Sequence, residues 1–236
     1  MKKTLIITNV LTIILLAGIT IYTFLARKHS KAENKKCTYA LTNFNYNHKN
    51  ETSNPSIVML GNSLIKGGNW DSLLNRKDII NRGIAGDRLH CICERLKYLD
   101  EYSPKICFIE GGINDLAWKQ TDSLFEYYVQ MVQYFRNRKI LPVITCVLSI
   151  APTAETSHLR IKDYRTVNTD VDRLNAKLIA YAQKNNIDYI NLNDELSDST
   201  SHVLKDKYTV DGVHLTMPAY SIWTNRINAI LKSHGI

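Results

Sequence analysis

The sequence has few cysteines, and none is arranged with histidine at the spacing of a metal site. Five cysteines occur among the 236 residues, and no pair shows the ligand spacing of a zinc motif. Cys107 and Cys146 lie in apolar runs and are expected to be core thiols. We therefore predict no metal, no other cofactor and no disulfide scaffold.

The chain also lacks a net excess of basic residues beyond its first part. The formal net charge is +8, but residues 1–53 hold eight basic and two acidic side chains, whereas the rest hold 22 and 20. A nearly balanced main domain is not typical of a nucleic-acid-binding face, so no nucleic-acid partner is expected. No glycine-rich phosphate loop with a lysine is present either, which leaves a nucleotide-binding flavodoxin-like protein as a distant alternative.

Charge is missing altogether from residues 4–26. A helix of this length spans about 35 Å, enough to cross a hydrocarbon layer of about 30 Å. A cleaved signal peptide is the alternative, but its apolar part would be shorter, and Phe24 does not suit the minus-three position of a cleavage after Ala26. We predict an uncleaved signal anchor, or transmembrane helix, at residues 1–26, with the lipid bilayer as a partner.

The remainder of the chain divides into a linker and one domain. Residues 27–54 are rich in Lys, Asn and Thr and predict a juxtamembrane linker. Residues 55–236 alternate short apolar runs with helical stretches. Continuously apolar strands separated by helices predict an α/β fold, a three-layer α/β/α sandwich with a five-stranded parallel sheet. The predicted strands are residues 57–60, 78–81, 105–109, 141–148 and 188–192, and the predicted helices are 88–99, 123–138, 167–185 and 218–233.

Four short motifs occur in a fixed order along this domain. Gly-Asn-Ser63-Leu follows the first predicted strand, Gly86 lies in a turn after the second, and Gly-Ile-Asn114-Asp follows the third. Asp211-Gly-Val-His214 precedes the last predicted helix. Ligands of parallel sheets bind beyond the carboxyl ends of the strands. The motifs are therefore expected to meet at one rim of the sheet.

Together the motifs supply the groups that acyl transfer needs. A serine hydroxyl is a weak nucleophile until a base removes its proton, so Ser63 would need His214, held in turn by Asp211. The N–H groups of Ser63 and Gly86 and the side-chain amide of Asn114 would form the oxyanion hole. Each residue alone has a common structural explanation, such as a helix cap for Ser63 or a turn for Gly86. Their combination in this order predicts a serine esterase.

These motifs give the chain a resemblance to the SGNH hydrolases, also called the GDSL esterase/lipase family. It is most similar to their platelet-activating-factor-acetylhydrolase-like and carbohydrate-acetylesterase branches. The segments IVMLGNSLIKGGNWD, NRGIAGD, IEGGINDL and DGVHLT carry the resemblance, which extends over roughly residues 55–234. It implies a flavodoxin-like SGNH fold and metal-independent ester hydrolysis by Ser63, His214 and Asp211. Asn62 stands where the family has Asp, but that Asp is not the triad acid.

The expected substrate is a short-chain acyl ester, above all an acetyl ester, of a glycan or lipid. Trp118 is a candidate for contact with the substrate, although packing is the commoner use of such a ring. Asp87 and Asp115 are expected to accept main-chain N–H bonds at helix starts. Two alternatives stay open: a non-catalytic envelope-binding module with the same fold, and an O-acyltransferase that uses the same serine.

The side of the membrane is not fixed by the sequence. Basic residues after the predicted span outnumber those before it, which by the positive-inside rule favours a cytoplasmic domain. Large domains cross membranes despite such charges, however. Since an N-terminal anchor on a hydrolase usually serves the envelope, we expect a single-pass, membrane-anchored protein with an extracytoplasmic catalytic domain.

Overall fold

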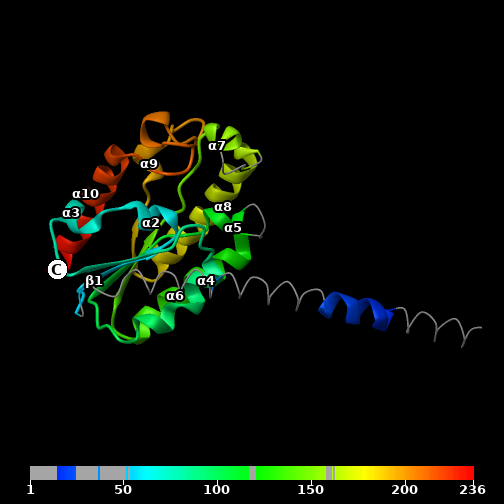
Figure 1. Ribbon diagram of the computed structural model, residues 1–236, viewed down its shortest axis with the longest axis horizontal. Coiled ribbons are helices and arrows are strands. Elements are labelled where there is room, and N and C mark those ends of the chain that lie inside the picture. Colours follow the sequence, from blue (N-terminus) through cyan, green and yellow to red (C-terminus); the bar gives the residue numbers. More distant parts are fainter. Residues whose placement is uncertain are drawn as a thin grey trace, which may run out of the picture. The chain divides into compact units, whose positions relative to one another are not determined.

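The computed structural model (Figure 1) describes residues 15–24, 37, 52, 54–116, 121–157, 161 and 163–236. The chain forms two compact units, Met1–Asn47 and His48–Ile236. In the first unit, residues 15–24 are helical. Among the residues described, no helix is both long enough and apolar enough to span a bilayer. The rest of the anchor predicted for residues 1–26, and most of the predicted linker, lie outside the described residues.

A five-stranded parallel sheet forms the centre of the second unit, in the order β2-β1-β3-β4-β5. This order is that of flavodoxin-like, doubly wound folds. The predicted α/β class and the five-stranded parallel sheet are thereby confirmed. The strands are β1 (Ile57–Gly61), β2 (Ile79–Gly83), β3 (Ile106–Ile109), β4 (Leu141–Thr145) and β5 (Asp188–Ile190).

Helices follow the strands along the chain. The long predicted helices are present, although the one predicted at residues 88–99 ends at Glu94 and continues as a 3₁₀ turn. The shorter helices were not predicted, because one or two turns carry little periodicity. The helices of the described domain are α2 (Ser63–Gly67), α3 (Trp70–Leu74), α4 (Leu89–Glu94), η1 (Leu96–Leu99), α5 (Ile113–Leu116), α6 (Thr121–Asn137), α7 (Thr153–Thr156), α8 (Tyr164–Lys184), α9 (Asn193–Leu196), η2 (Asp206–Tyr208) and α10 (Met217–Ser233).

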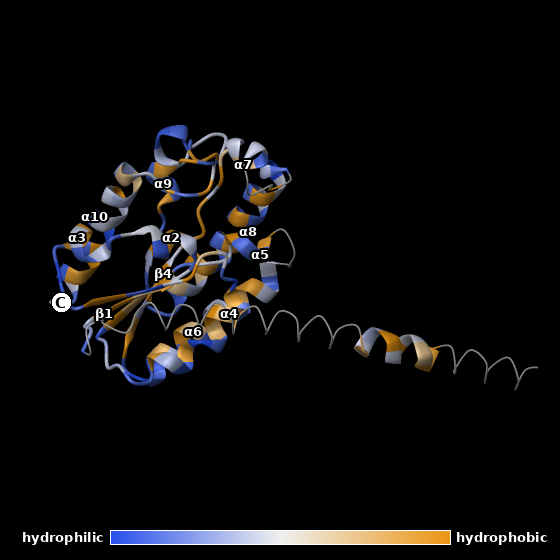
Figure 2. Cartoon of the chain, in the orientation of Figure 1, coloured by the Kyte–Doolittle hydropathy of each residue, from blue (hydrophilic) through white to orange (hydrophobic). Residues whose placement is uncertain are grey.

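Two apolar clusters, one on each face of the sheet, make up the core. Successive strand residues point to opposite faces, so Val58 and Leu60 pack with α4, α6 and α8. Met59 and its neighbours on the other face pack with α2, α3 and α10, where Trp70 and Trp223 are buried edge to face. Figure 2 shows the hydrophobic strands between helices whose outer faces are hydrophilic. The three predicted layers follow from this burial on both faces.

The fourth strand is shorter than predicted, because its pairing ends at Thr145 rather than at residue 148. Beyond it, asparagine side chains replace a neighbouring strand. Asn175 of α8 accepts from the N–H of Val147 at 2.9 Å and donates to its carbonyl at 2.8 Å. Asn168 does the same for Ile150, at 2.8 and 2.9 Å. The apolar run therefore continues as buried chain without continuing as a strand.

Replacing Asn175 by Leu should destabilise the domain by about 1–3 kcal/mol, because the buried N–H of Val147 would lose its partner, while the Val147 carbonyl would keep only its bond from Asn193. Urea denaturation followed by circular dichroism measures the change. Asn225→Leu, at an exposed position of α10, is the matched control and should change stability by less than about 0.5 kcal/mol. Equal midpoints for the two variants would contradict this role of Asn175.

Candidate active site

Ser63 is the first residue of α2 and is separated from the end of β1 by Asn62 alone. The preceding Asn62 caps the helix, since its Oδ1 accepts from the N–H of Leu64 at 2.8 Å. Gly61 permits the tight turn between strand and helix: a Cβ there would lie 2.4 Å from the carbonyl oxygen of Glu110. The strand, the cap and the close approach of β3 together fix where the half-buried Ser63 lies.

Asp211 and His214 belong to one tight turn before α10. The Oδ1 of Asp211 accepts from the N–H groups of Val213 and His214, at 3.1 and 2.8 Å. The Oδ2 lies 2.7 Å from the Nδ1 of His214. Gly212 has φ +93°, and a Cβ there would lie 2.2 Å from the amide nitrogen of Ala154, so the turn requires glycine.

Hydrogen bonds keep the Asp211 carboxyl ionised. Burial alone raises its pKa, but the bonds from the His214 ring and from the main-chain N–H groups outweigh burial, and the pKa is lowered. An ionised Asp211 accepts a hydrogen bond from Nδ1–H of His214. That bond leaves Nε2 as the acceptor nitrogen of the neutral ring.

The Nε2 of His214 lies 3.0 Å from the Oγ of Ser63. These two residues are 151 positions apart in the chain, yet their side chains are within hydrogen-bonding distance. With the Asp211 bond, the arrangement is a continuous carboxylate–imidazole–hydroxyl chain. Such a chain can transfer a proton from the hydroxyl to the imidazole.

The other two predicted oxyanion residues come after neighbouring strands, Gly86 in the loop that follows β2 and Asn114 in α5, which follows β3. Gly86 is exposed, has φ +73° and has no atom within 4 Å of where a Cβ would stand. Asn114, at the start of α5, donates from Nδ2 to the carbonyl oxygen of Asp87 at 2.8 Å. A primary amide carries two N–H donors, so this bond fixes the Asn114 side chain and leaves one donor for a further acceptor. Trp118, the predicted substrate contact, lies outside the described residues.

A buried ion pair joins the loops of the site. Arg95 donates from Nε to Asp87 Oδ2 at 2.8 Å and from Nη2 to the carbonyl oxygen of Gly61 at 2.9 Å. Asp87 was expected to cap a helix, and its ion pair with Arg95 was not predicted. Asp115 does accept from a helix start, the N–H of Leu89, at 3.0 Å. Arg95 lies between Glu94 and Lys97 in the sequence, so no local pattern indicated that it would be buried.

Glu110 is a further residue that sequence reasoning missed. It follows β3, has no solvent exposure, and its Oε1 accepts from Nδ2 of Asn62 at 3.3 Å. Burial raises the pKa of Glu110 to about 8, although the main-chain and side-chain amides of Asn62 lower it. The carboxyl group is therefore largely protonated at neutral pH. No sequence pattern indicated that this acidic residue would be buried.

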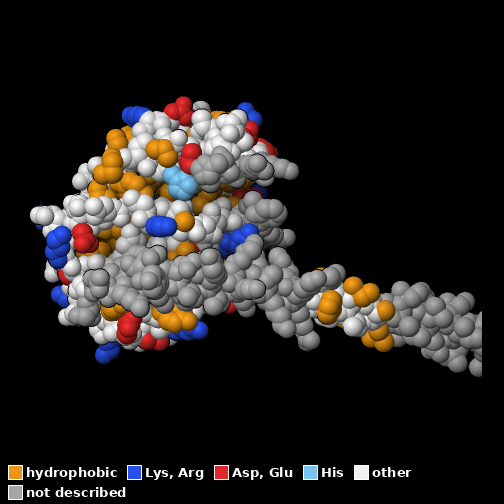
Figure 3. All heavy atoms as spheres, in the orientation of Figure 1, with side chains coloured by type: hydrophobic (Ala, Val, Ile, Leu, Met, Phe, Trp, Pro, Cys, Tyr) orange, Lys and Arg blue, Asp and Glu red, His pale blue; other side chains and the backbone are white. Residues whose placement is uncertain are grey.

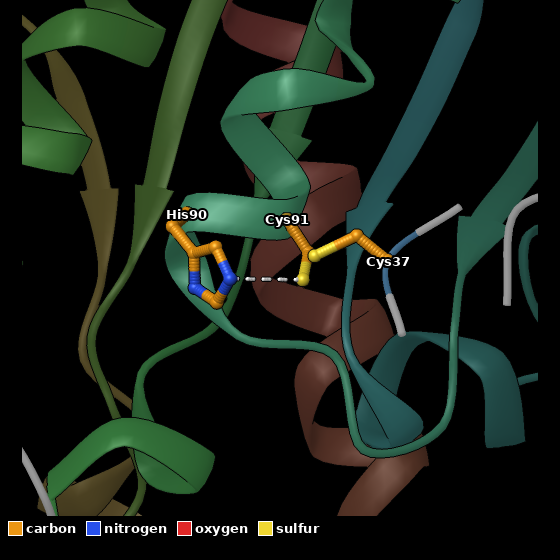
Figure 4. Close-up of side chains that lie close together, drawn as sticks. All are labelled: Cys37, His90 and Cys91. Atoms are coloured by element: carbon orange, nitrogen blue, oxygen red, sulfur yellow. Dashed lines mark hydrogen bonds between the residues drawn. The ribbon is translucent and has the colours of Figure 1, made fainter. Parts of the chain in front are cut away.

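His90 and Cys91, two neighbouring residues of α4, are of types that bind metal ions. On α4, the Nε2 of His90 lies 3.4 Å from the Sγ of Cys91 (Figure 4). Cys37 and Cys91 are each disulfide-bonded, so Cys91 offers no thiolate ligand. Neither cysteine was predicted from the sequence to form a disulfide, because no disulfide scaffold was expected. Cys107 and Cys146 are buried free thiols, as predicted. The absence of a metal stays a prediction.

Charged side chains are scattered over the face of the domain that Figure 3 shows. On the face shown in Figure 3, the described Lys and Arg side chains alternate with Asp and Glu and form no continuous basic patch. This distribution agrees with the small net charge of the domain. That no nucleic acid binds remains a prediction.

Comparisons with known proteins give the family of the chain and its fold. The model of the GDSL-like lipase/acylhydrolase family matches residues 59–222. Among solved structures, an acylhydrolase candidate from Bacteroides fragilis is 25% identical, with a TM-score of 0.67 over 77% of this chain and 88% of that one. A GDSL-like lipase from Bacteroides thetaiotaomicron is 27% identical, with a TM-score of 0.66 over 77% and 89%. An acetyl xylan esterase, 16% identical, shares the fold, with a TM-score of 0.59 over 74% and 98%. A search of curated proteins gave no match.

Stability should fall as pH rises from the ordinary Glu pKa of 4.5 to about 8, because folded Glu110 retains a proton that the unfolded chain releases. One group of this kind contributes about 1.4 kcal/mol per pH unit in that window. In Glu110→Gln this part of the decline should be absent. Urea denaturation of both proteins across the window measures the difference. Parallel curves for the two proteins would show that Glu110 is ionised in the fold.

Proposed function

Because this chain belongs to the GDSL-like lipase/acylhydrolase family and is therefore a carboxylic ester hydrolase, we propose that it cleaves short-chain acyl esters through Ser63, His214 and Asp211. The distance of 3.0 Å between the Ser63 hydroxyl and the His214 ring is the observation that most supports this mechanism. The acyl group we propose is acetyl, and the alcohol is a glycan or a lipid. The acetyl proposal draws on the name of one structural relative, an acetyl xylan esterase.

In the acylation step, His214 takes the proton of Ser63 as the hydroxyl oxygen bonds to the ester carbonyl carbon. Asp211 holds the ring in the required tautomer and stabilises its positive charge. The C–O bond to the alcohol then breaks, and the imidazolium gives its proton to the leaving oxygen. Water, deprotonated by His214, attacks the acyl-serine, and the acid leaves with Ser63 reprotonated.

Charge develops on the carbonyl oxygen in both steps. We assign its stabilisation to the N–H groups of Ser63 and Gly86 and to the second N–H of Asn114. The bond from Asn114 to the Asp87 carbonyl supports this role, because an amide already fixed in place loses little entropy when it receives the oxyanion. Trp118 stays a candidate for contact with the alcohol part of the substrate.

The predicted location belongs to the same proposal. We propose that residues 1–26 anchor the enzyme in a bilayer, residues 27–54 form the linker, and residues 55–236 form an extracytoplasmic hydrolase domain. The exposed apolar side chains of the described residues 15–24 support contact with lipid. The disulfide-bonded state of Cys91 supports an oxidising compartment. Partition of the full chain into membranes after alkaline carbonate washing tests the anchor.

Replacement of Ser63 by Ala should lower kcat/KM for p-nitrophenyl acetate by at least about 10⁴-fold, because the nucleophile is lost. A fluorophosphonate should label wild-type Ser63 and leave the variant unlabelled. Ser72→Ala, at an exposed position of α3, is the matched control and should keep wild-type activity. Undiminished hydrolysis by the folded Ser63 variant would exclude the mechanism. Absence of labelling in the wild type would favour a binding module, and faster transfer to a sugar than to water would indicate an acyltransferase.

Substitution of Asp211 by Asn should lower kcat by about 10³–10⁴-fold with a small effect on KM, because the amide cannot hold the same imidazole tautomer. Steady-state kinetics on p-nitrophenyl acetate measure both constants. Asp188→Asn is a suitable control, since Asp188 also bonds a histidine, His234, at 2.6 Å but belongs to β5, outside the proposed triad. An equal loss in both variants would mean that the bond to His214 has no special role.

A further inference from the structure

A buried acid that the mechanism does not use lies next to the turn that presents Ser63. Glu110 has no solvent exposure, and its Oε2 has no hydrogen-bond partner among the residues described. An ionised carboxylate with so few donors is costly to bury. The neutral acid needs fewer donors and suits this position.

Asn62 links this acid to the nucleophile. Its Nδ2 donates to Oε1 of Glu110, and its Oδ1 accepts from the N–H of Leu64 and thereby caps α2. The N–H of Lys66 also donates to the Asn62 carbonyl, at 3.0 Å. Because Ser63 is the first residue of this helix, the orientation of the Asn62 amide determines how the turn holds Ser63. Glu110 fixes which end of that amide faces the helix.

The neighbouring polar groups do not neutralise a charge on Glu110. Tyr128 of α6 donates its hydroxyl to the carbonyl of Gly111, at 2.7 Å, and Tyr220 of α10 donates to that of Leu64, also at 2.7 Å. Both phenols therefore use their only proton elsewhere. The buried guanidinium of Arg95 bonds Asp87 and the Gly61 carbonyl.

We propose that Asn62 and Glu110 form one positioning pair for Ser63, which works with Glu110 protonated and fails when Glu110 loses its proton. The inference rests on the proposed function of Ser63. Ionisation of Glu110 places an unpaired negative charge beside the nucleophile turn, where it opposes the growing charge of the oxyanion. An aspartate at position 62 would also place a negative charge beside Ser63, because its carboxyl group would contact that of Glu110 and the two could not both stay neutral acceptors and donors in the present arrangement.

The test exchanges the acid and the amide between the two positions. Asn62→Asp should lower kcat for p-nitrophenyl acetate by about tenfold with little change in KM, since two contacting acids conflict. The double variant Asn62→Asp/Glu110→Gln restores one acid and one amide and should recover kcat to within about threefold of wild type. Such recovery is not expected if each residue only fills space.

The second readout is the pH profile from about pH 6 to about pH 10. Wild-type kcat should fall on the alkaline side near the pKa of Glu110, about 8. Glu110→Gln should retain most of the activity at neutral pH and lose this alkaline fall. Glu126→Gln, the same change at an exposed position of α6, should keep the wild-type profile.

Two outcomes would overturn the pair: no recovery in the double variant, or an alkaline fall that persists in Glu110→Gln. If Asn62→Asp does not fold, as judged by circular dichroism, the profile of the isosteric Glu110→Gln decides alone. Fluorophosphonate labelling of wild-type Ser63 is a separate arm. Failure of that labelling rejects the proposed function, whereas labelling without the two predicted effects rejects only the pair.

Discussion

The architecture depends on how main-chain groups find partners where the strands end. After Cys146, whose N–H still bonds the Ile190 carbonyl of β5, the buried chain has no strand partner, so its N–H and carbonyl groups need other partners. The side chains of Asn168, Asn175 and Asn193 supply them by mimicking strand edges. The chain so fixed reaches Ala151, whose N–H donates to the Gly212 carbonyl at 2.8 Å. The position of the turn that holds His214 therefore depends on hydrogen bonds from asparagines of helices that are distant in the sequence.

A second buried constraint acts on the other side of the nucleophile. Arg95 bonds both Asp87 and the carbonyl of Gly61, and Asn114 bonds the carbonyl of Asp87. The loop of Gly86 and the end of β1 are thus tied to one guanidinium. Removal of one partner of a buried ion pair destabilises a protein by more than the intact pair stabilises it, because the remaining charge is left unpaired in the interior. This part of the site is consequently fixed as a unit.

Much of the fold could be predicted because its signals are local. Apolar runs gave the five strands, and helical periodicity gave the long helices, since burial selects these patterns directly. The motif residues could be named because their types are needed for the chemistry. Asn175 could not, because a polar residue on a helix is ordinarily assigned to the solvent side, and its partner lies 28 residues away. Glu110 was missed for the same reason: an acid becomes acceptable in the interior only through a particular neighbour, here Asn62.

The base and its carboxylate lie within four consecutive residues of one turn, while the hydroxyl that they serve comes from the far end of the domain's sequence. Any movement of this turn consequently displaces Asp211 and His214 together. A displacement of that turn would lengthen the gap to Ser63 and leave the imidazole still oriented by its own carboxylate. Motion of this one short segment can therefore stop catalysis. The domain need not unfold, and the bond between Asp211 and His214 need not change. Whether the site is active then depends on how tightly this single turn packs against the rest of the domain.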